Sequence, residues 1–289
     1  MRVRNAEFEI DGYRFGCSHP VDVLGWDLGA REVRVQDTPR PGAPGLMLGR
    51  DFDDPPEWTF TFRARNDQSA EVAFDEIETF RRVWQASQGV GEVSALRYGL
   101  PGRERVVFGR PRRWSLDDDA IRQGIHIGRL AGLATFQLSD VRSFSDVVSE
   151  VSLGLVPESS GGLVFPLVFP VTTTVTGGVR AGFVENLGSA PAPVTVTFKG
   201  PVKNPRIYTD EWEIGITGNL AYDETVTVDA LALSVVNQAG ANVGGRLTRG
   251  TRLRDAALVP GQSEIRFTGG DSTGTARATV SWRDASYGI

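Results

Sequence analysis

The chain is dominated by short runs in which apolar and polar residues alternate, and this pattern predicts strands rather than helices. The strongest run in the first half is Trp58–Arg63, where three aromatic residues share one face and polar residues occupy the other. A strand with one large apolar face must bury it, so we expect this run to form the spine of an N-terminal core. Further strands are expected at 8–10, 13–16, 33–35, 93–98, 106–108, 121–127 and 133–138.

One segment of the first half has a helical period. Its apolar residues recur at intervals of three, three and four, which places them on one face of a helix over about 70–86. Asp67 or Ser69 can cap the start of this helix, and Gly89 can end it. We expect the apolar stripe to pack against strands as part of the core rather than to hold a ligand. The stripe consists of Phe74, Ile77, Phe80 and Trp84.

The second half alternates almost throughout from about residue 171. Its expected strands, at 194–198, 212–216, 226–228, 231–235, 265–267 and 276–282, follow one another without helices, which is typical of a β-sandwich. Residues 139–170 are rich in serine, glycine and proline, which favour loops. We therefore expect a mostly β protein with an N-terminal domain at 1–142, a linker at 143–170 and a C-terminal domain at 171–289.

Length and charge are those of an ordinary globular protein. The 289 residues are enough for two domains. With 36 acidic and 31 basic residues the net charge is −5, which argues against a general attraction to nucleic acid or anionic membranes. Cys17 is the single cysteine, so no intrachain disulfide can form. The longest apolar run, 163–171, is too short to span a membrane, and the first residues do not resemble a signal peptide. We expect a protein that is made in the cytoplasm and not exported.

Patterns that can carry chemistry are interpreted as structural. Gly270–Gly274 matches the nucleophile-elbow pattern G-x-S-x-G, but a strand pattern follows it and no histidine lies beyond His126, so we expect a hairpin turn. Asp51, Asp53 and Asp54 lack the spacing of a calcium loop, so we expect a turn there, with a loose cation site as the alternative. The sequence predicts no catalytic residue, no metal site and no cofactor. Paired carboxylates that meet only in the fold are not visible at this level.

A group of arginines is followed along the chain by a run of aspartates. One interpretation is a solvated hairpin with its turn at the aspartates. The alternative is a complementary charged seam between identical subunits, where basic residues of one copy meet acidic residues of the next. The residues concerned are Arg103, Arg105, Arg110, Arg112, Arg113, Asp117, Asp118 and Asp119.

Several segments resemble tail proteins of long-tailed phages. The runs Phe8–Tyr13, Val23–Gly29 and Gly49–Phe60 are similar to minor tail proteins of phages that infect actinobacteria. The second half resembles the siphovirus tail-component family, whose best-known members are distal tail proteins. The resemblance covers nearly the whole chain and depends on the order and spacing of its segments. In the second half these segments are Gly162–Pro166, Asn186–Val194, Gly200–Ile207 and Leu258–Phe267.

The resemblance implies an N-terminal split-barrel domain with one helix and a C-terminal galectin-like sandwich. It implies that the N-terminal domain assembles into a homohexameric ring at the tail tip of the virion. Such a ring joins the tail tube protein to the tail-tip or baseplate hub protein, with the tape measure protein as a further candidate partner. DNA passes through the lumen, where basic groups would retain it, so we expect Asp117, Asp118 and Asp119 to face the lumen or an adjacent subunit.

The competing interpretation is a carbohydrate-binding adhesin module that contacts the host cell wall. Galectin-like sandwiches can stack an exposed aromatic ring against a sugar. The candidates are Tyr208, Trp212, Tyr222 and Tyr287. We expect Trp212 to be buried, because it begins an alternating strand, and Tyr208 to be the more exposed. A nucleic-acid-binding protein is disfavoured by the net charge and by the absence of an interleaved basic and aromatic stretch.

Overall fold

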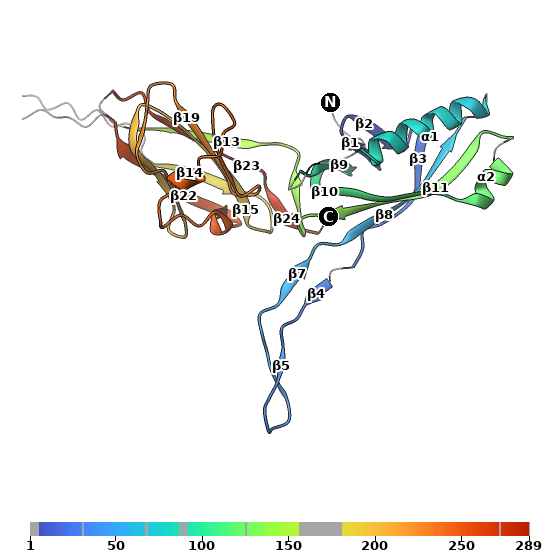
Figure 1. Ribbon diagram of the computed structural model, residues 1–289, viewed down its shortest axis with the longest axis horizontal. Coiled ribbons are helices and arrows are strands. Elements are labelled where there is room, and N and C mark those ends of the chain that lie inside the picture. Colours follow the sequence, from blue (N-terminus) through green and yellow to red (C-terminus); the bar gives the residue numbers. More distant parts are fainter. Residues whose placement is uncertain are drawn as a thin grey trace, which may run out of the picture. The chain divides into compact units, whose positions relative to one another are not determined.

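The computed structural model describes residues 6–30, 32–66, 69–86, 89, 92–124, 126–155, 181–271 and 273–288. The chain divides into two compact units (Figure 1). Unit 1 runs to Asp146 and also includes the C-terminal Tyr287 and Gly288, whereas unit 2 runs from Val147 to Ser286. Both units are built mainly from strands, which confirms the predicted mostly β fold class.

Unit 1 contains one large sheet with antiparallel neighbours, in the order β2-β1-β9-β10-β11-β8-β3. As predicted, β8 buries one face, and it pairs along its length with β11. A further strand, β12 (Arg142–Ser145), pairs with β10. The path strands are β1 (Glu7–Ile10), β2 (Tyr13–Gly16), β3 (Val21–Asp27), β8 (Glu57–Arg65), β9 (Ser94–Leu100), β10 (Arg103–Leu116) and β11 (Arg129–Leu138).

Helix α1 (Ala70–Trp84) covers the apolar face of this sheet, and its existence was predicted from the sequence. Ile77, Phe80 and Trp84 are fully buried, whereas Phe74 is only partly buried against the same core. The indole Nε1 of Trp84 donates a hydrogen bond to the Thr135 carbonyl on β11 at 3.2 Å. Ser69 occupies the N-cap position but makes no side-chain capping bond, and Asp67 lies outside the described residues.

The prediction of a strand at 121–127 is wrong. A short helix, α2 (Asp118–Gly124), connects β10 to β11 instead. The Asp117 carboxylate accepts a hydrogen bond from the backbone N–H of Asp119 at 3.0 Å, which caps the helix start. Asp118 and Asp119 occupy the first turn, where the helix dipole favours negative charge. These local effects outweigh the alternation of isoleucines that suggested a strand.

A long hairpin, which we call the arm (residues 28–56), extends from the unit 1 sheet (Figure 1). The turn expected at Asp51–Asp54 is wrong in part, because Phe52–Asp54 forms a strand that pairs with Glu32–Arg34. Nearer the tip, Thr38 and Pro39 form a short strand that pairs with Leu46 and Met47. The arm consists of β4 (Glu32–Arg34), β5 (Thr38–Pro39), β6 (Leu46–Met47) and β7 (Phe52–Asp54).

Unit 2 is a sandwich of two antiparallel sheets with the orders β13-β23-β15-β19-β20 and β14-β22-β16-β17. β21 (Ala257–Leu258) joins the first sheet and β18 (Asn219–Leu220) the second. The inward residues are almost completely buried, and they include Val196, Phe198, Ile207, Phe267 and Val280. The remaining elements are β13 (Ser149–Gly154), β14 (Ala181–Asn186), β15 (Ala192–Lys199), β16 (Val202–Tyr208), β17 (Glu213–Gly215), β19 (Thr225–Asp229), β20 (Ser234–Asn237), η1 (Gly244–Arg246), η2 (Leu253–Asp255), β22 (Gly261–Gly270) and β23 (Arg277–Trp282). The last strand, β24 (Ala285–Tyr287), belongs to the large sheet described above and not to the sandwich.

The segment expected as a linker at 143–170 contains strands in its first part. Ser143 lies in β12 and is buried, and its hydroxyl donates to the Gly288 carbonyl at 2.6 Å. Strand β13 pairs with β23 over six residue pairs and buries Leu153. The serine content suggested a loop, but the intervening apolar residues give β13 a buried face. Residues 156–180 of the expected linker and following segment lie outside the described residues.

The turn expected at Gly270–Gly274 is a connection between the two sheets rather than a hairpin, because β22 and β23 belong to different sheets. Asp271 holds this connection. One carboxylate oxygen accepts from the backbone N–H and the hydroxyl of Thr273, both at 2.7 Å, and the other accepts from the backbone N–H of Ala276 at 2.9 Å. Ser272 lies outside the described residues.

Candidate functional site

The arginines of the expected charged cluster are spread along one strand. Arg103 begins β10, and Asp117 follows its other end, roughly 40 Å away at the rise of an extended strand. Arg110 is used within its own chain, because it donates to the backbone carbonyls of Glu92 and Gly89 at 2.7 and 2.6 Å. Arg105 is half-buried. No ion pair joins these arginines to the three aspartates in the described part of the chain. Exposed side chains without a described partner are those of Arg103, Arg112 and Arg113.

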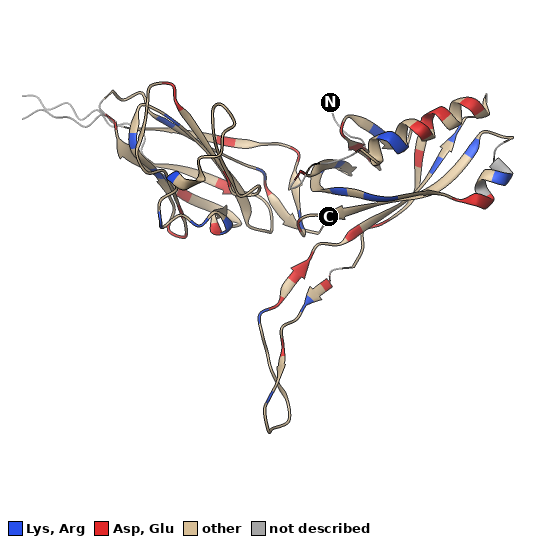
Figure 2. Cartoon of the chain, in the orientation of Figure 1, with Lys and Arg blue, Asp and Glu red and all other residues tan. Residues whose placement is uncertain are grey.

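The three aspartates all lie on the surface at the start of α2. Asp119 forms an ion pair with Arg122, one turn further along the same helix. Figure 2 shows this acidic group at one end of unit 1, together with the acidic residues of α1. Asp117 is thus used as the helix cap and Asp119 in an ion pair, whereas the exposed Asp118 side chain has no partner among the described residues.

The arm forms an apolar surface that was not predicted from the sequence. Its apolar side chains are exposed rather than packed, with Leu48 83% exposed and Val35, Leu46 and Met47 about half exposed. The tip is closed by a hydrogen bond from the backbone N–H of Arg40 to the Gly45 carbonyl at 3.1 Å. The sequence signal was present, since three consecutive apolar residues lie between Gly45 and Gly49 without a polar residue to alternate with them.

An apolar cleft of about 750 Å³ lies in unit 1 at the root of the arm. Among the residues that line it are Leu28, Trp58, Val107, Leu138 and Val141, together with Tyr287. Tyr287, a candidate for stacking on a sugar, is thus placed in unit 1 rather than in the sandwich.

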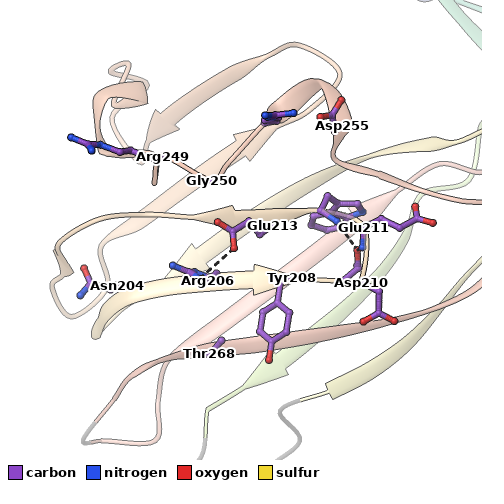
Figure 3. A pocket seen from close by; sticks show the side chains of 13 residues that line it. Asn204, Arg206, Tyr208, Asp210, Glu211, Glu213, Arg249, Gly250, Asp255 and Thr268 are labelled. Atoms are coloured by element: carbon purple, nitrogen blue, oxygen red, sulfur yellow. Dashed lines mark hydrogen bonds and ion pairs between the residues drawn. The ribbon is translucent and has the colours of Figure 1, made fainter.

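A second cleft, of about 800 Å³, lies in unit 2 and is mainly polar (Figure 3). Its floor is the hairpin of β16 and β17, and one wall is the segment from Arg249 to Asp255. Arg206 and Glu213 form an ion pair of 3.3 Å across the floor. Figure 3 shows the Tyr208 ring projecting from β16 beside the strand that carries Thr268. The charged members of this cleft could not be predicted together from the sequence, because they come from separate segments.

The aromatic candidates for stacking have different positions. Tyr208 lines the polar cleft and is partly exposed. Trp212 also lines it but is only 7% exposed, and its Nε1 donates to the Ala257 carbonyl at 2.9 Å, so its ring is part of the core. Tyr222 is 72% exposed on a turn outside the cleft. Only Tyr208 combines partial exposure with a place in the cleft.

Neither cleft has the ligands of a metal centre. No group of three or more histidine, cysteine, aspartate or glutamate side chains that could hold an ion occurs among the residues that the structure describes. The loose cation site considered for Asp51, Asp53 and Asp54 therefore gains no support. No helix in the described ranges is both long and apolar enough to cross a membrane.

The fold is similar to solved proteins of phage tails. The Dit protein of phage SPP1, described as a paradigm of the hub adsorption apparatus in phages that infect Gram-positive bacteria, matches with a TM-score of 0.61 and 12% identity. The match covers 96% of this chain and 98% of that chain. Two structures of the phage P2 baseplate in its activated conformation, one with Ca and one with Sr, each match with a TM-score of 0.54 and 10% identity, over 95% of this chain and 97% of theirs. No protein-family model and no curated protein sequence matches the chain. At these identities the likeness shows a shared fold along nearly the whole chain.

Proposed function

We propose that this protein is a structural component of a phage tail tip, a distal tail protein that forms a ring rather than an enzyme. In this proposal unit 1 assembles into a homohexamer that joins the tail tube protein to the tail-tip or baseplate hub protein. The tape measure protein is a further candidate partner, and DNA passes through the lumen without specific binding. The shared fold with Dit and baseplate proteins supports this role.

The observation that carries the proposal is the exposed arm. A two-stranded hairpin without a packed core is at best marginally stable in water. Here the tip places Leu46, Met47 and Leu48 in solvent, and the paired strands on either side are only two or three residues long. Such an element gains stability when a partner covers it. The apolar cleft at the root of the arm in a neighbouring copy has matching chemistry, and in this proposal it receives the tip.

The edges of the unit 1 sheet support closure into a ring. The first and last strands of the sheet order are β2 and β3, and within the described residues each pairs with only one neighbouring strand, which leaves backbone groups of its other edge available. Leu24 and Trp26 on β3 are exposed, so this edge also offers apolar side chains. Two different edges can join head to tail, and a head-to-tail contact closes into a ring when the rotation between copies divides a full turn.

The mass of the purified full chain in solution tests the proposal. We expect light scattering to give six times the mass of one chain, or a concentration-dependent approach to it. A triple variant with Leu46→Ser, Met47→Ser and Leu48→Ser should remain folded but lose the assembly. Leu187→Ser is the control, because Leu187 is an exposed leucine like Leu48 but lies in unit 2. A chain that stays single at high concentration and is absent from purified virions contradicts the proposal.

A carbohydrate-binding adhesin role for unit 2 is the second candidate. The observation that favours it is the polar cleft of about 800 Å³ with Tyr208 on its floor. This role is compatible with the first, because it uses the other unit of the chain.

A further inference from the structure

The outward face of the β14-β22-β16-β17 sheet carries a row of aromatic and charged side chains. On β14, Phe183 lies directly opposite Glu264, and two residues further along β22, Arg266 lies opposite Tyr208. Phe183 is 68% exposed, whereas its inward neighbour Val184 is buried. From the strand spacing and rise, the backbones at Phe183 and Tyr208 are about 12 Å apart. Two aromatic rings thus flank a charged pair on one surface.

The charged groups between the two rings are held in fixed geometry. Arg266 donates to both carboxylate oxygens of Glu264, at 3.0 and 2.9 Å. These hydrogen bonds hold the pKa of Glu264 below its ordinary value, and they fix the orientation of its carboxylate. At the other end of the row, the Arg206 and Glu213 pair supplies a second donor and acceptor combination.

The wall of the cleft is anchored to the floor by backbone and hydroxyl contacts. The backbone N–H of Gly215 donates to the Thr251 hydroxyl at 3.0 Å, and the backbone N–H of Thr248 donates to the Gly215 carbonyl at 2.9 Å. Gly250 lies against the carboxylate of Glu213, where a Cβ would collide with it. The wall therefore passes close over the floor, and it places Arg249 and Arg252 beside the cleft with no described side-chain partner of their own.

The chemistry of the cleft selects one class of ligand. Four carboxylates and three guanidinium groups line it, so a free anion meets repulsion as well as attraction. The mainly polar lining does not suit an apolar ligand. A neutral sugar has hydroxyl groups that both donate and accept, and the C–H face of its ring is apolar enough to stack on an aromatic side chain. Tyr208 and Phe183 provide such rings beside fixed donors and acceptors.

We propose that the cleft and the adjoining outward face, from Phe183 to Glu213, bind a chain of neutral sugar residues. Tyr208 stacks on one ring of the chain, and Phe183 supports a neighbouring one. Arg206, Glu213 and Arg252 hydrogen-bond the hydroxyl groups of the sugar in the cleft. The site deepens the adhesin candidate, and it rests on the proposed tail-tip location only for the source of the sugar, the host cell surface.

Calorimetric titration of the full-length protein tests the site. The probes are cellohexaose, maltohexaose and N-acetylchitohexaose, with inorganic phosphate and polygalacturonate as anionic comparisons. We expect at least one neutral hexasaccharide to bind with a dissociation constant of about 1 mM or below, and Tyr208→Ala to weaken it about tenfold or more. Tyr208→Phe keeps the ring and should stay within about threefold of the wild type. Arg252→Ala, at an exposed position, should weaken binding by loss of hydrogen bonds without loss of folding.

Tyr222→Ala is the matched control, since Tyr222 is an exposed tyrosine of the same unit outside the cleft. The proposal is overturned if no neutral probe binds, if only the anionic probes bind, or if Tyr222→Ala rather than Tyr208→Ala abolishes binding. The solution mass of the same samples is measured in parallel. A hexamer that binds no sugar refutes the site and leaves the ring proposal standing. A protein that remains a single chain but binds a neutral sugar refutes the ring and supports the site.

Discussion

The side-chain amide of Asn186 donates a hydrogen bond to the backbone carbonyl of Leu258 at 3.0 Å, across 72 residues of sequence. The same amide donates to the Ala190 carbonyl at 2.8 Å, and its oxygen accepts from the backbone N–H groups of Gly188 and Ala285. Asn186, Ala190, Leu258 and Ala285 are all at most 1% exposed, so their polar groups have little access to water. One buried side chain thus connects three segments of unit 2.

Asn186→Leu should destabilise unit 2 by about 3 kcal/mol or more, because it leaves buried donors and acceptors without partners at a typical cost of 1–3 kcal/mol each. Amide hydrogen exchange of β14 and β21 measures this loss as a fall in the local opening free energy. The control is Leu187→Ala, next in sequence and 76% exposed, which should change it by less than about 0.5 kcal/mol. Unchanged exchange in Asn186→Leu would show that the network is not important for stability.

Trp84 connects α1 to the sheet in unit 1 by both packing and a hydrogen bond. Its ring contacts Phe80 and Phe136 with centroid distances of 5.3 and 6.2 Å, in addition to the bond to the Thr135 carbonyl. We expect Trp84→Ala to cost about 3–5 kcal/mol through the cavity that it leaves. Trp84→Phe should cost less, about 1–3 kcal/mol, because it loses mainly the hydrogen bond.

The measurement for Trp84 is denaturant unfolding followed by the fluorescence of the unit 1 tryptophans. Val72→Ala is the control on the same helix, where the exposed side chain is shortened and helix propensity rises slightly. Equal losses for Trp84→Phe and Val72→Ala would contradict a specific role for the indole hydrogen bond.

The sequence was informative wherever burial of one face sets the period. Trp58, Phe60 and Phe62 alternate because β8 has one buried face, and the spacing of Ile77, Phe80 and Trp84 follows from the buried side of α1. These patterns are local, so they are visible without knowledge of the fold. Strand β13 was missed for the opposite reason, since its serines resemble a loop until pairing with β23 buries the residues between them.

The candidate surfaces were harder to predict because they depend on contacts between distant segments. Arg206 and Arg249 line one cleft only because two threonines near Arg249 form hydrogen bonds with Gly215 on β17. These threonines are Thr248 and Thr251. The connection at Asp271 could be recognised as a turn, but not as a crossing between sheets, because strand partners are not written in a local pattern. The partial exposure of Tyr208 agrees with the sequence-based expectation, whereas its ligand remains a prediction.

Asp271 should make unit 2 sensitive to acid. Burial alone would raise the pKa of this carboxyl, but the hydrogen bonds from the Thr273 hydroxyl and from backbone N–H groups outweigh burial and hold the pKa below its ordinary value. A pKa that is lower in the folded state gives stability that is present above the unfolded value of about 3.9 and is lost as pH falls through the folded value. We expect the unfolding temperature of unit 2 to drop as pH falls below about 4.

Asp271→Asn tests this assignment by calorimetry over the same pH range. The amide has only one acceptor oxygen, so it cannot accept from both Thr273 and the Ala276 N–H as the two carboxylate oxygens do, and the variant should already be less stable at pH 7, by about 1–3 kcal/mol. The variant should then lose less of its unfolding free energy on acidification than the wild type does. Asp223→Asn, at an exposed turn, is the control and should keep the wild-type acid response. An undiminished acid response in Asp271→Asn would assign the sensitivity to other groups.

The opposite charges at the two ends of β10 allow self-association of the chain to be tested by charge reversal. If Arg103 of one copy meets the aspartates of the next, Arg103→Glu should weaken assembly of the full chain, and addition of salt should weaken the wild-type assembly in the same direction. Because Arg103 is exposed and has no described partner, folding stability should change by less than about 0.5 kcal/mol. Sedimentation at several protein and salt concentrations measures the dissociation constant, with Arg249→Glu in unit 2 as the control. Combining Arg103→Glu with Asp118→Arg should restore assembly through the exchanged pair. If the single reversal leaves the dissociation constant unchanged and the double variant behaves as the sum of its parts, these side chains are only a solvated surface, and apolar contacts of the arm must account for the ring.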